Sequence, residues 1–282
     1  MVRAMDRRSF LAALGAATAA ATAGGLPRTA AAASTSLPIG LQLYTVRSLM
    51  QRDMPGTLAQ IAKIGYREVE FAGYFGRTPA QVRALLAERK LTSPSTHLGM
   101  DVLTGAGAER TLADAREIGH QWATIAWIDA GQRKTLDDWK RIAATFNRIG
   151  AQARAAGLRF AYHNHDFEFP LVDGTIPLAV LLRETDPATV DFEMDVYWLV
   201  KAGHDPLTWL AHYPERFRLL HLKDAGPPPE RRMLDVGAGT IDWRSVLAAA
   251  TGVQHAFVEH DAPSDPLASA RASLTYLAKL KV

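Results

Sequence analysis

The chain of 282 residues contains no cysteine. This absence excludes disulfide bonds, a thiolate metal site and a cysteine nucleophile. A second absence is that of a glycine-rich phosphate turn after the first apolar strand, "LQLYTVR", so a dinucleotide-binding fingerprint is missing. Any metal or catalytic site must therefore be built from histidine, carboxylate, lysine and hydroxyl groups.

The first 33 residues have the pattern of an export signal. Arg7 and Arg8 precede Phe10 and an Ala-rich run, and "TAAAAS" then offers a cleavage site of small residues. The alternative is a membrane anchor, but spanning requires about 20 strongly apolar residues, and this Ala, Thr and Gly run is weakly hydrophobic. We predict a twin-arginine signal peptide at 1–33, read by the export machinery through residues 6–11. A periplasmic or otherwise exported domain at 34–282 is expected to follow.

The basic character of the chain comes from this leader. Residues 1–33 contain four arginines and one acid, and removing them from totals of 32 and 29 leaves 28 basic and 28 acidic residues. A balanced chain carries no electrostatic footprint for nucleic acid. We therefore expect no nucleic-acid partner, and no stable membrane insertion once the leader is removed.

Eight apolar segments alternate with amphipathic helical segments. The strands are predicted at 39–46, 68–73, 92–99, 122–128, 158–165, 190–197, 217–224 and 255–261. In "AKIGYREVEF", "REIGHQWATI" and "RAAGLRFAYH" a helix ends in Gly and a strand follows at once. Eight strands separated by helices over about 250 residues predict a single (β/α)8 TIM barrel. An open doubly wound sheet is the alternative.

Polar residues gather where four successive strands end. In such a barrel the chemistry lies at the carboxyl ends of the strands. Imidazole with carboxylate suits a divalent metal such as Mn, Zn, Co or Fe(II). Each residue has a plainer interpretation: a histidine can be structural, Asp195 can cap a helix, and Lys223 can pair with Asp224. The coincidence on four strands favours a metal site formed among His163, His165, Asp195, His221, Lys223 and Glu259.

The order of several motifs resembles the xylose-isomerase-like TIM barrel superfamily of sugar phosphate isomerases and epimerases. These motifs are "GLQLYTVR", "STHLG", "YHNHDFEF", "EMDVYWLVKAG", "LLHLKD", "VGAGTIDW" and "FVEHD", and the resemblance covers residues 37–282. It implies one divalent ion per chain, Mn, Zn, Co or Mg, held by His163, Asp195, His221 and Glu259. It is also compatible with a homo-oligomer, since dimers and tetramers are common in the family.

The sequence departs from the family at His163, where many members have Glu. This change removes one of the two carboxylates that ketose epimerases use for proton transfer. Glu168 could replace it only if its loop folds back over the site. The endonuclease IV branch needs further histidines, whereas Trp127 and Trp198 occupy the corresponding positions. The expected substrate contacts are His97, His165, Trp127, Trp198 and Tyr44.

These residues lead us to expect a metal-dependent isomerase or epimerase of a sugar or polyol. Glu259 is the expected base that removes the proton next to a carbonyl to form an enediolate, and Lys223 is expected to hold or reprotonate the developing alkoxide. One alternative is a lyase or dehydratase acting on a 3-keto sugar, a 3-keto glycoside or an inosose. The other is a non-catalytic carbohydrate-binding barrel. In each case the partner is a small carbohydrate.

Overall fold

The computed structural model describes residues 37–280. The predicted export signal at 1–33 lies outside these residues. Within the described range, no helix is long and apolar enough to cross a membrane.

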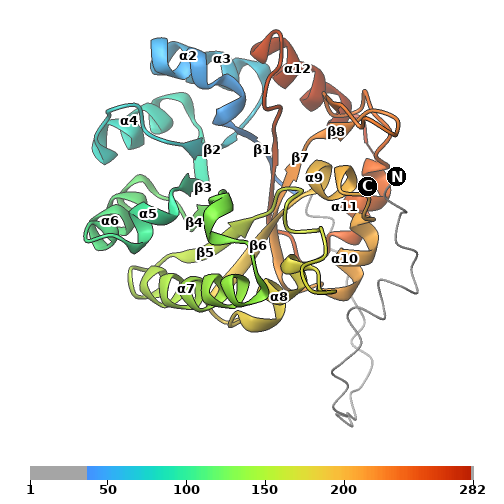
Figure 1. Ribbon diagram of the computed structural model, residues 1–282. Helices are drawn as coiled ribbons and strands as arrows, with labels where there is room; N and C mark the ends of the chain where they lie inside the picture. Colours follow the sequence, from blue (N-terminus) through green and yellow to red (C-terminus); the bar gives the residue numbers. More distant parts are fainter. Residues whose placement is uncertain (1–36, 281–282) are drawn as a thin grey trace, which may run out of the picture.

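Eight parallel strands close into a barrel, which confirms the predicted fold. Each strand pairs with its neighbours in the order β1-β10-β7-β6-β5-β4-β3-β2. Figure 1 shows the helices arranged around these strands. The strands are β1 (Ile39–Gln42), β2 (Glu68–Ala72), β3 (Thr92–Leu98), β4 (Trp122–Ile125), β5 (Arg159–His163), β6 (Val190–Asp195), β7 (Phe217–Leu222) and β10 (His255–Val258).

The helices begin and end where the sequence provides caps. Thr78 and Thr135 form capping boxes at two N-termini. Gly65, Gly119 and Gly157 have positive φ after three helices, as the repeated Gly phrase predicts. The helices are α2 (Arg47–Arg52), α3 (Met54–Ile64), α4 (Pro79–Arg89), α5 (Met100–Thr104), α6 (Ala108–Ile118), α7 (Leu136–Ala155), α8 (Pro177–Glu184), α9 (Val196–Lys201), α10 (Pro206–His212), α11 (Trp243–Ala249) and α12 (Pro266–Leu277).

Short elements occupy some of the connections. The 3-10 helices η1 (Leu43–Val46) and η2 (Ala130–Gln132) follow β1 and β4, and a small hairpin joins β8 (Asp224–Ala225) to β9 (Met233–Leu234). The first and last helical regions meet, because α12 contacts α3 and the Tyr66 hydroxyl donates to the Ala270 carbonyl at 2.8 Å. Figure 1 shows this contact between the blue and red ends of the described chain.

The strands end earlier than the sequence pattern predicts. β5 ends at His163 rather than at 165, β4 at Ile125 rather than at 128, and β10 at Val258 rather than at 261. Apolar alternation continues past the point where the backbone ladder stops, so it does not mark that point. Several of the predicted site residues therefore lie in the loops at the carboxyl end of the barrel.

The apolar interior has two parts. The larger lies between the strands and the surrounding helices. The smaller fills the barrel itself and consists of Trp122, Ala161, Leu219 and Phe257. Gly40 permits this packing, because a Cβ at that position would lie 2.6 Å from the Phe257 ring. This apolar layer supports the polar residues above it.

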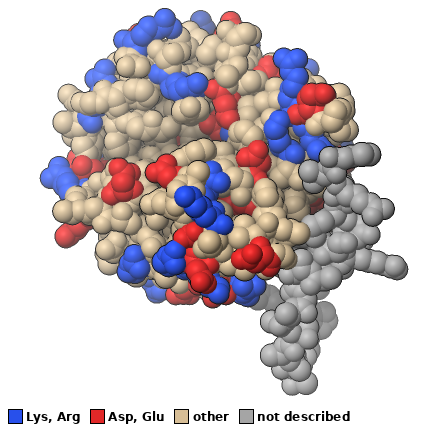
Figure 2. Space-filling model, viewed as in Figure 1, with Lys and Arg blue, Asp and Glu red and all other residues tan. Residues whose placement is uncertain are grey.

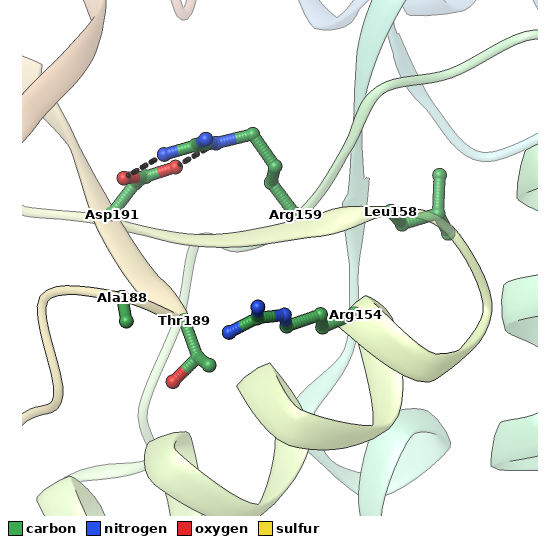
Figure 3. Close-up of a pocket in the computed structure, with 6 residues that line it drawn as sticks. All are labelled: Arg154, Leu158, Arg159, Ala188, Thr189 and Asp191. Atoms are coloured by element: carbon green, nitrogen blue, oxygen red, sulfur yellow. Dashed lines mark hydrogen bonds and ion pairs between the residues drawn. The ribbon is translucent and has the colours of Figure 1, made fainter.

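An ion pair between buried Asp191 and half-exposed Arg159 lies below the apolar layer, at the amino-terminal end of the barrel. Asp191 accepts hydrogen bonds from Arg159 Nε at 2.6 Å, Arg159 Nη2 at 2.7 Å and Trp122 Nε1 at 2.9 Å. Figure 3 shows this pair beside a hollow of about 340 Å³, whose lining also includes Arg154, Leu158, Ala188 and Thr189. We assign this ion pair to the stability of the fold, because the chemistry of TIM barrels lies at the opposite end.

We predict that Asp191→Ala lowers the free energy of unfolding by about 2 kcal/mol. The change leaves the buried Trp122 N–H without an acceptor, while half-exposed Arg159 can turn to water. Urea unfolding measures the loss. Arg183→Ala is the control, because it breaks only an exposed pair with Glu184 and is expected to cost less than about 0.5 kcal/mol. Equal stability of the two variants would contradict the role of Asp191.

Candidate metal centre

The carboxyl end of the barrel gathers buried charge from most of its strands. Figure 2 shows acidic and basic side chains interspersed on the outer surface, without a continuous patch of one sign on the face drawn. The concentration of charge lies inside instead. Strand alternation turns every second residue into the barrel. The inward-facing polar residues are Gln42, Glu70, His97, His163, Glu193, Asp195 and His221, with Lys223 and Glu259 following β7 and β10.

The lower layer of this cluster is centred on two carboxylates, Glu70 and Glu193. Glu70 Oε2 accepts from His221 Nε2 at 2.6 Å and from Gln42 Nε2 at 2.7 Å. Glu193 Oε2 accepts from His97 Nε2 at 2.8 Å and lies 3.1 Å from His163 Nδ1. Each carboxylate thereby fixes the orientation of imidazole rings that project toward the rim.

The upper layer contains the four residues predicted as metal ligands. His221 Nδ1 lies 2.8 Å from Glu259 Oε2, and His163 Nε2 lies 3.6 Å from Asp195 Oδ2. Lys223 joins the two carboxylates, with Nζ at 3.0 Å from Asp195 Oδ2 and 2.7 Å from Glu259 Oε2. The same ammonium donates to Asp261 Oδ1 at 2.8 Å. The sequence-predicted set is thus brought together around one point.

The residues of the upper layer fit a divalent metal. The ligand atoms of Asp195, His221 and Glu259 all lie within 4.8 Å of one another. Bonds of about 2.0–2.2 Å to a metal separate neighbouring ligand atoms by about 3 Å, so this spacing suits a single ion. Asp195 Oδ2 is buried and accepts no well-directed hydrogen bond. The contact with Lys223 shows that this position already attracts a cation.

A second grouping of possible ligands shares His221 with this set. It consists of His97, His163, Glu193 and His221 in the lower layer. Because His221 belongs to both groups, the two are not independent sites. Metal-bound histidines commonly donate their other ring nitrogen to a carboxylate, and Glu70 and Glu193 accept in this manner. The upper group is therefore the better candidate for the ion.

Burial and neighbouring carboxylates set the charges of the cluster. Burial alone lowers the pKa of His97, but Glu70 and Glu193 outweigh it and raise this pKa to about 9. Burial likewise opposes the charge on His221, yet Glu193, Glu70 and Glu259 raise its pKa well above the ordinary value. Protons on these two rings balance buried carboxylates.

Two further groups of the cluster respond to burial in different ways. Burial opposes the ammonium of Lys223, but Asp195, Glu259 and Asp261 raise its pKa well above the usual value. Burial raises the pKa of Asp195 to about 6, against the opposing effect of Lys223. Lys223 is therefore a cation in this setting, and the buried carboxylates around it depend on its charge.

Most of the predicted substrate contacts lie at the rim. His165 has its ring 5.0 Å from that of His163 and 5.5 Å from that of Trp198. Trp127 lies 5.3 Å from His165 on the outer side. The structure places His97 lower, between Glu70 and Glu193. Tyr44 lies in η1, 41% exposed, under the Arg47 guanidinium.

Glu168 lies away from the cluster. The Tyr162 hydroxyl donates to one of its carboxylate oxygens, and the His165 backbone N–H donates to the other at 2.9 Å. Tyr162 faces outward, where its ring packs 4.9 Å from that of Phe146 in α7. Strand alternation explains the result: Tyr162 and His163 point to opposite sides, and Glu168 joins the outer one. The expected catalytic role for Glu168 is not supported by this position.

Sequence reasoning missed Glu70 and Glu193 as members of the site. A signal for them was present. "EVEF" and "DFEMD" each carry acids at every second position of otherwise apolar strands. A period of two sends these acids to the same side of a barrel strand, and in a closed barrel that side is the interior.

The closed parallel barrel and its cluster of histidines and carboxylates define a TIM barrel with a candidate metal centre at the carboxyl end. The chain belongs to the family described as "Xylose isomerase-like TIM barrel", whose model matches residues 58–280. The chain is also 37% identical over 90 residues to an inosose dehydratase from Lacticaseibacillus casei. That match covers 32% of this chain and 30% of the relative.

Solved structures share the architecture. A sugar phosphate isomerase/epimerase from Parabacteroides distasonis has a TM-score of 0.73 and 26% identity, with 89% of this chain and 98% of that chain covered. A 3-keto-D-glucoside 4-epimerase from E. coli has a TM-score of 0.66 and 16% identity, covering 86% and 99%. The latter likeness shows the fold alone.

We predict that Asp195→Asn weakens binding of Mn²⁺ or Zn²⁺ at least about tenfold, because the neutral amide is a poor ligand for these ions. Isothermal titration calorimetry and elemental analysis of the purified protein measure the effect. Asp137→Asn is the control, since its carboxylate is exposed on α7. Less than about a tenth of an equivalent of metal in the wild-type protein, after supplementation, would contradict a metal centre.

We predict that Glu70→Gln weakens the same binding by about 10–100-fold without removing any ligand. The carboxylate that fixes His221 through Nε2 would be replaced by an amide, which holds the imidazole less strongly. Titration of the metal into both proteins tests this expectation. An unchanged affinity would show that Glu70 does not orient His221.

Proposed function

We propose that this protein is a metal-dependent lyase that removes the proton next to the carbonyl of a keto sugar or keto polyol and expels a neighbouring oxygen. One observation carries this choice. Among the carboxylates around the Lys223 ammonium, Glu259 is the nearest, at 2.7 Å, ahead of Asp261 at 2.8 Å and Asp195 at 3.0 Å. Epimerisation by proton transfer on both faces of a carbon needs a second carboxylate, and His163 stands where related epimerases have it. Glu168 does not replace it, because it accepts a hydrogen bond from Tyr162 on the outer side of β5.

The chain's own residues supply both proton transfers. Glu259 accepts the proton from carbon, and the C–H electron pair becomes the new C=C bond. The adjacent C–O bond breaks with its electrons on oxygen, and Lys223 donates the proton that this oxygen needs. The products are an unsaturated ketone and water or an alcohol, so no oxidant or reductant is required. A bound divalent ion would polarise the carbonyl and make the neighbouring proton more acidic.

Other groups prepare these transfers. Asp195 and Asp261 hold Lys223 in its charged form beside Glu259. Burial of the cluster strengthens each electrostatic contact, because little water competes for the charges. Glu70 and Glu193 keep His221 and His163 directed at the same point from below.

Sequence relatives support the lyase. The first curated relatives matched are named inosose dehydratases, although the chain spans only about 30–41% of their length. Their reaction is an elimination of water from a cyclic keto polyol, which is the chemistry that one base and one acid can perform. The particular substrate, an inosose, a 3-keto sugar or a 3-keto glycoside, is part of the proposal.

A sugar isomerase is the second candidate. It is favoured by the closeness of Lys223 and Glu259, because one base can move a proton between adjacent carbons on the same face. The structural neighbour named a sugar phosphate isomerase/epimerase points the same way. Solvent deuterium in a recovered isomer would favour this reaction, whereas an unsaturated product absorbing in the ultraviolet would favour the lyase. Absence of bound metal would favour a non-catalytic carbohydrate-binding barrel.

We predict that Lys223→Met slows the elimination of an alkyl alcohol from a 3-keto glucoside by about 10²–10⁴-fold. The same variant should slow the loss of p-nitrophenol far less, because this leaving group needs no proton. Glu259→Gln should abolish turnover of both substrates. Product formation is followed by ultraviolet absorbance, and metal content is measured in each variant as a control. Equal slowing of both substrates by Lys223→Met would contradict its role as the acid.

A further inference from the structure

An aromatic surface lies at the rim, next to the candidate centre. Trp127 is the most exposed of the large hydrophobic side chains in residues 37–280, at 54%. It follows β4, and Phe167 and His165 follow β5, so all three belong to the carboxyl end of the barrel. We call Trp127, Phe167 and the nearby Arg133 the rim platform. Its indole is largely exposed to solvent, whereas the Phe167 ring is partly buried against the core.

The rim platform is held in a fixed arrangement. Trp127 Nε1 donates to Asp129 Oδ1 at 3.2 Å, and the indole meets the Phe167 ring edge-on at 5.3 Å. The Arg133 guanidinium lies 3.5 Å above the Phe167 ring, while its Nε donates to the Ile128 carbonyl at 2.9 Å. An exposed indole that is kept ordered in this way offers a preformed binding surface.

The rim platform is connected to the candidate centre through one ring. His165 contacts Trp127 at 5.3 Å on one side and His163 at 5.0 Å on the other. His165 therefore lies between the candidate centre and Trp127. A ligand with one ring at Glu259 and Lys223 would reach Trp127 with a second ring if that ring extended outward past His165. His165 Nδ1 and Trp198 Nε1 are buried and have no hydrogen-bond partner among the described residues, so polar groups along this path remain unsatisfied.

We propose that the rim platform is a binding subsite for a second ring of the substrate, so that the substrate is a glycoside or disaccharide rather than a single ring. The inference rests on the proposed function, because the second ring would be the alcohol that is expelled. The Trp127 face suits the C–H surface of a sugar or the face of an aromatic aglycone. The Arg133 guanidinium adds hydrogen-bond donors for hydroxyl groups.

Binding of probes that the enzyme does not turn over tests the subsite. The metal-loaded protein is titrated calorimetrically with two single-ring ligands, D-glucose and methyl β-D-glucoside, and two larger ones, phenyl β-D-glucoside and cellobiose. These probes lack the ketone, so no elimination occurs. The expected result is binding of the two-ring probes about tenfold tighter than that of the single-ring probes.

Variants distinguish a contribution of the rim platform to binding from effects of any exposed apolar substitution. Trp127→Ala should remove the tighter binding of the two-ring probes relative to the single-ring probes. Trp127→Phe should retain most of the difference. Leu171→Ala is the matched control, because Leu171 is similarly exposed, at 52%, and follows β5, as Phe167 of the rim platform does. It should change neither affinity.

The possible outcomes distinguish this inference from the proposed function. Ring-dependent binding that Trp127→Ala removes supports the subsite even if no lyase activity is found. Lyase activity with equal affinities for one and two rings overturns the subsite and leaves the reaction standing. Failure of every two-ring probe to bind also overturns it. So does a wild-type protein that self-associates on light scattering when Trp127→Ala does not, because the platform would then serve contact between copies.

Discussion

The balance of charge inside the barrel is the constraint on which this structure depends. Glu70, Glu193, Asp195 and Glu259 lie together at the carboxyl end, each almost fully removed from water. Buried carboxylates are costly unless cations and hydrogen bonds compensate them. The Lys223 ammonium and the protonated rings of His97 and His221 provide that compensation. The apolar layer around Phe257 lies directly beneath these charges and excludes water from that side of the cluster.

This need for charge compensation explains why the two ring nitrogens of a histidine face carboxylates in different layers. A ring such as His221 reaches a lower carboxylate through Nε2 and an upper one through Nδ1. A divalent ion would take the place of the proton on the upper nitrogen, so ion binding would release a proton and add one net positive charge to this carboxylate-rich cluster. The same buried cluster can therefore exist with protons or with a metal. Its geometry is held by the lower carboxylates in both cases.

Much of the fold could be predicted from the sequence, because the determining signals are local. Apolar periodicity located all eight strands, and the Gly residues located helix ends such as Gly65. The structure places His163, Asp195, His221 and Glu259 near one another, and their role as metal ligands stays a prediction. Strand ends were placed too late, since hydrophobic alternation continues beyond the ladder. The position of Glu168 could not be predicted, because it depends on which side of β5 its loop turns toward.

Asp195 has a further consequence for the order in which the site is assembled. Its Oδ2 faces the candidate centre, while its Oδ1 accepts the N–H of Trp198 at 2.9 Å and caps helix α9. The two oxygens of one carboxylate thus join the centre to the first turn of a helix that carries part of the rim. Any ion that draws on Oδ2 also acts on the cap. An ion bound at Oδ2 before the carbohydrate would therefore also act on the helix that carries Trp198 at the rim.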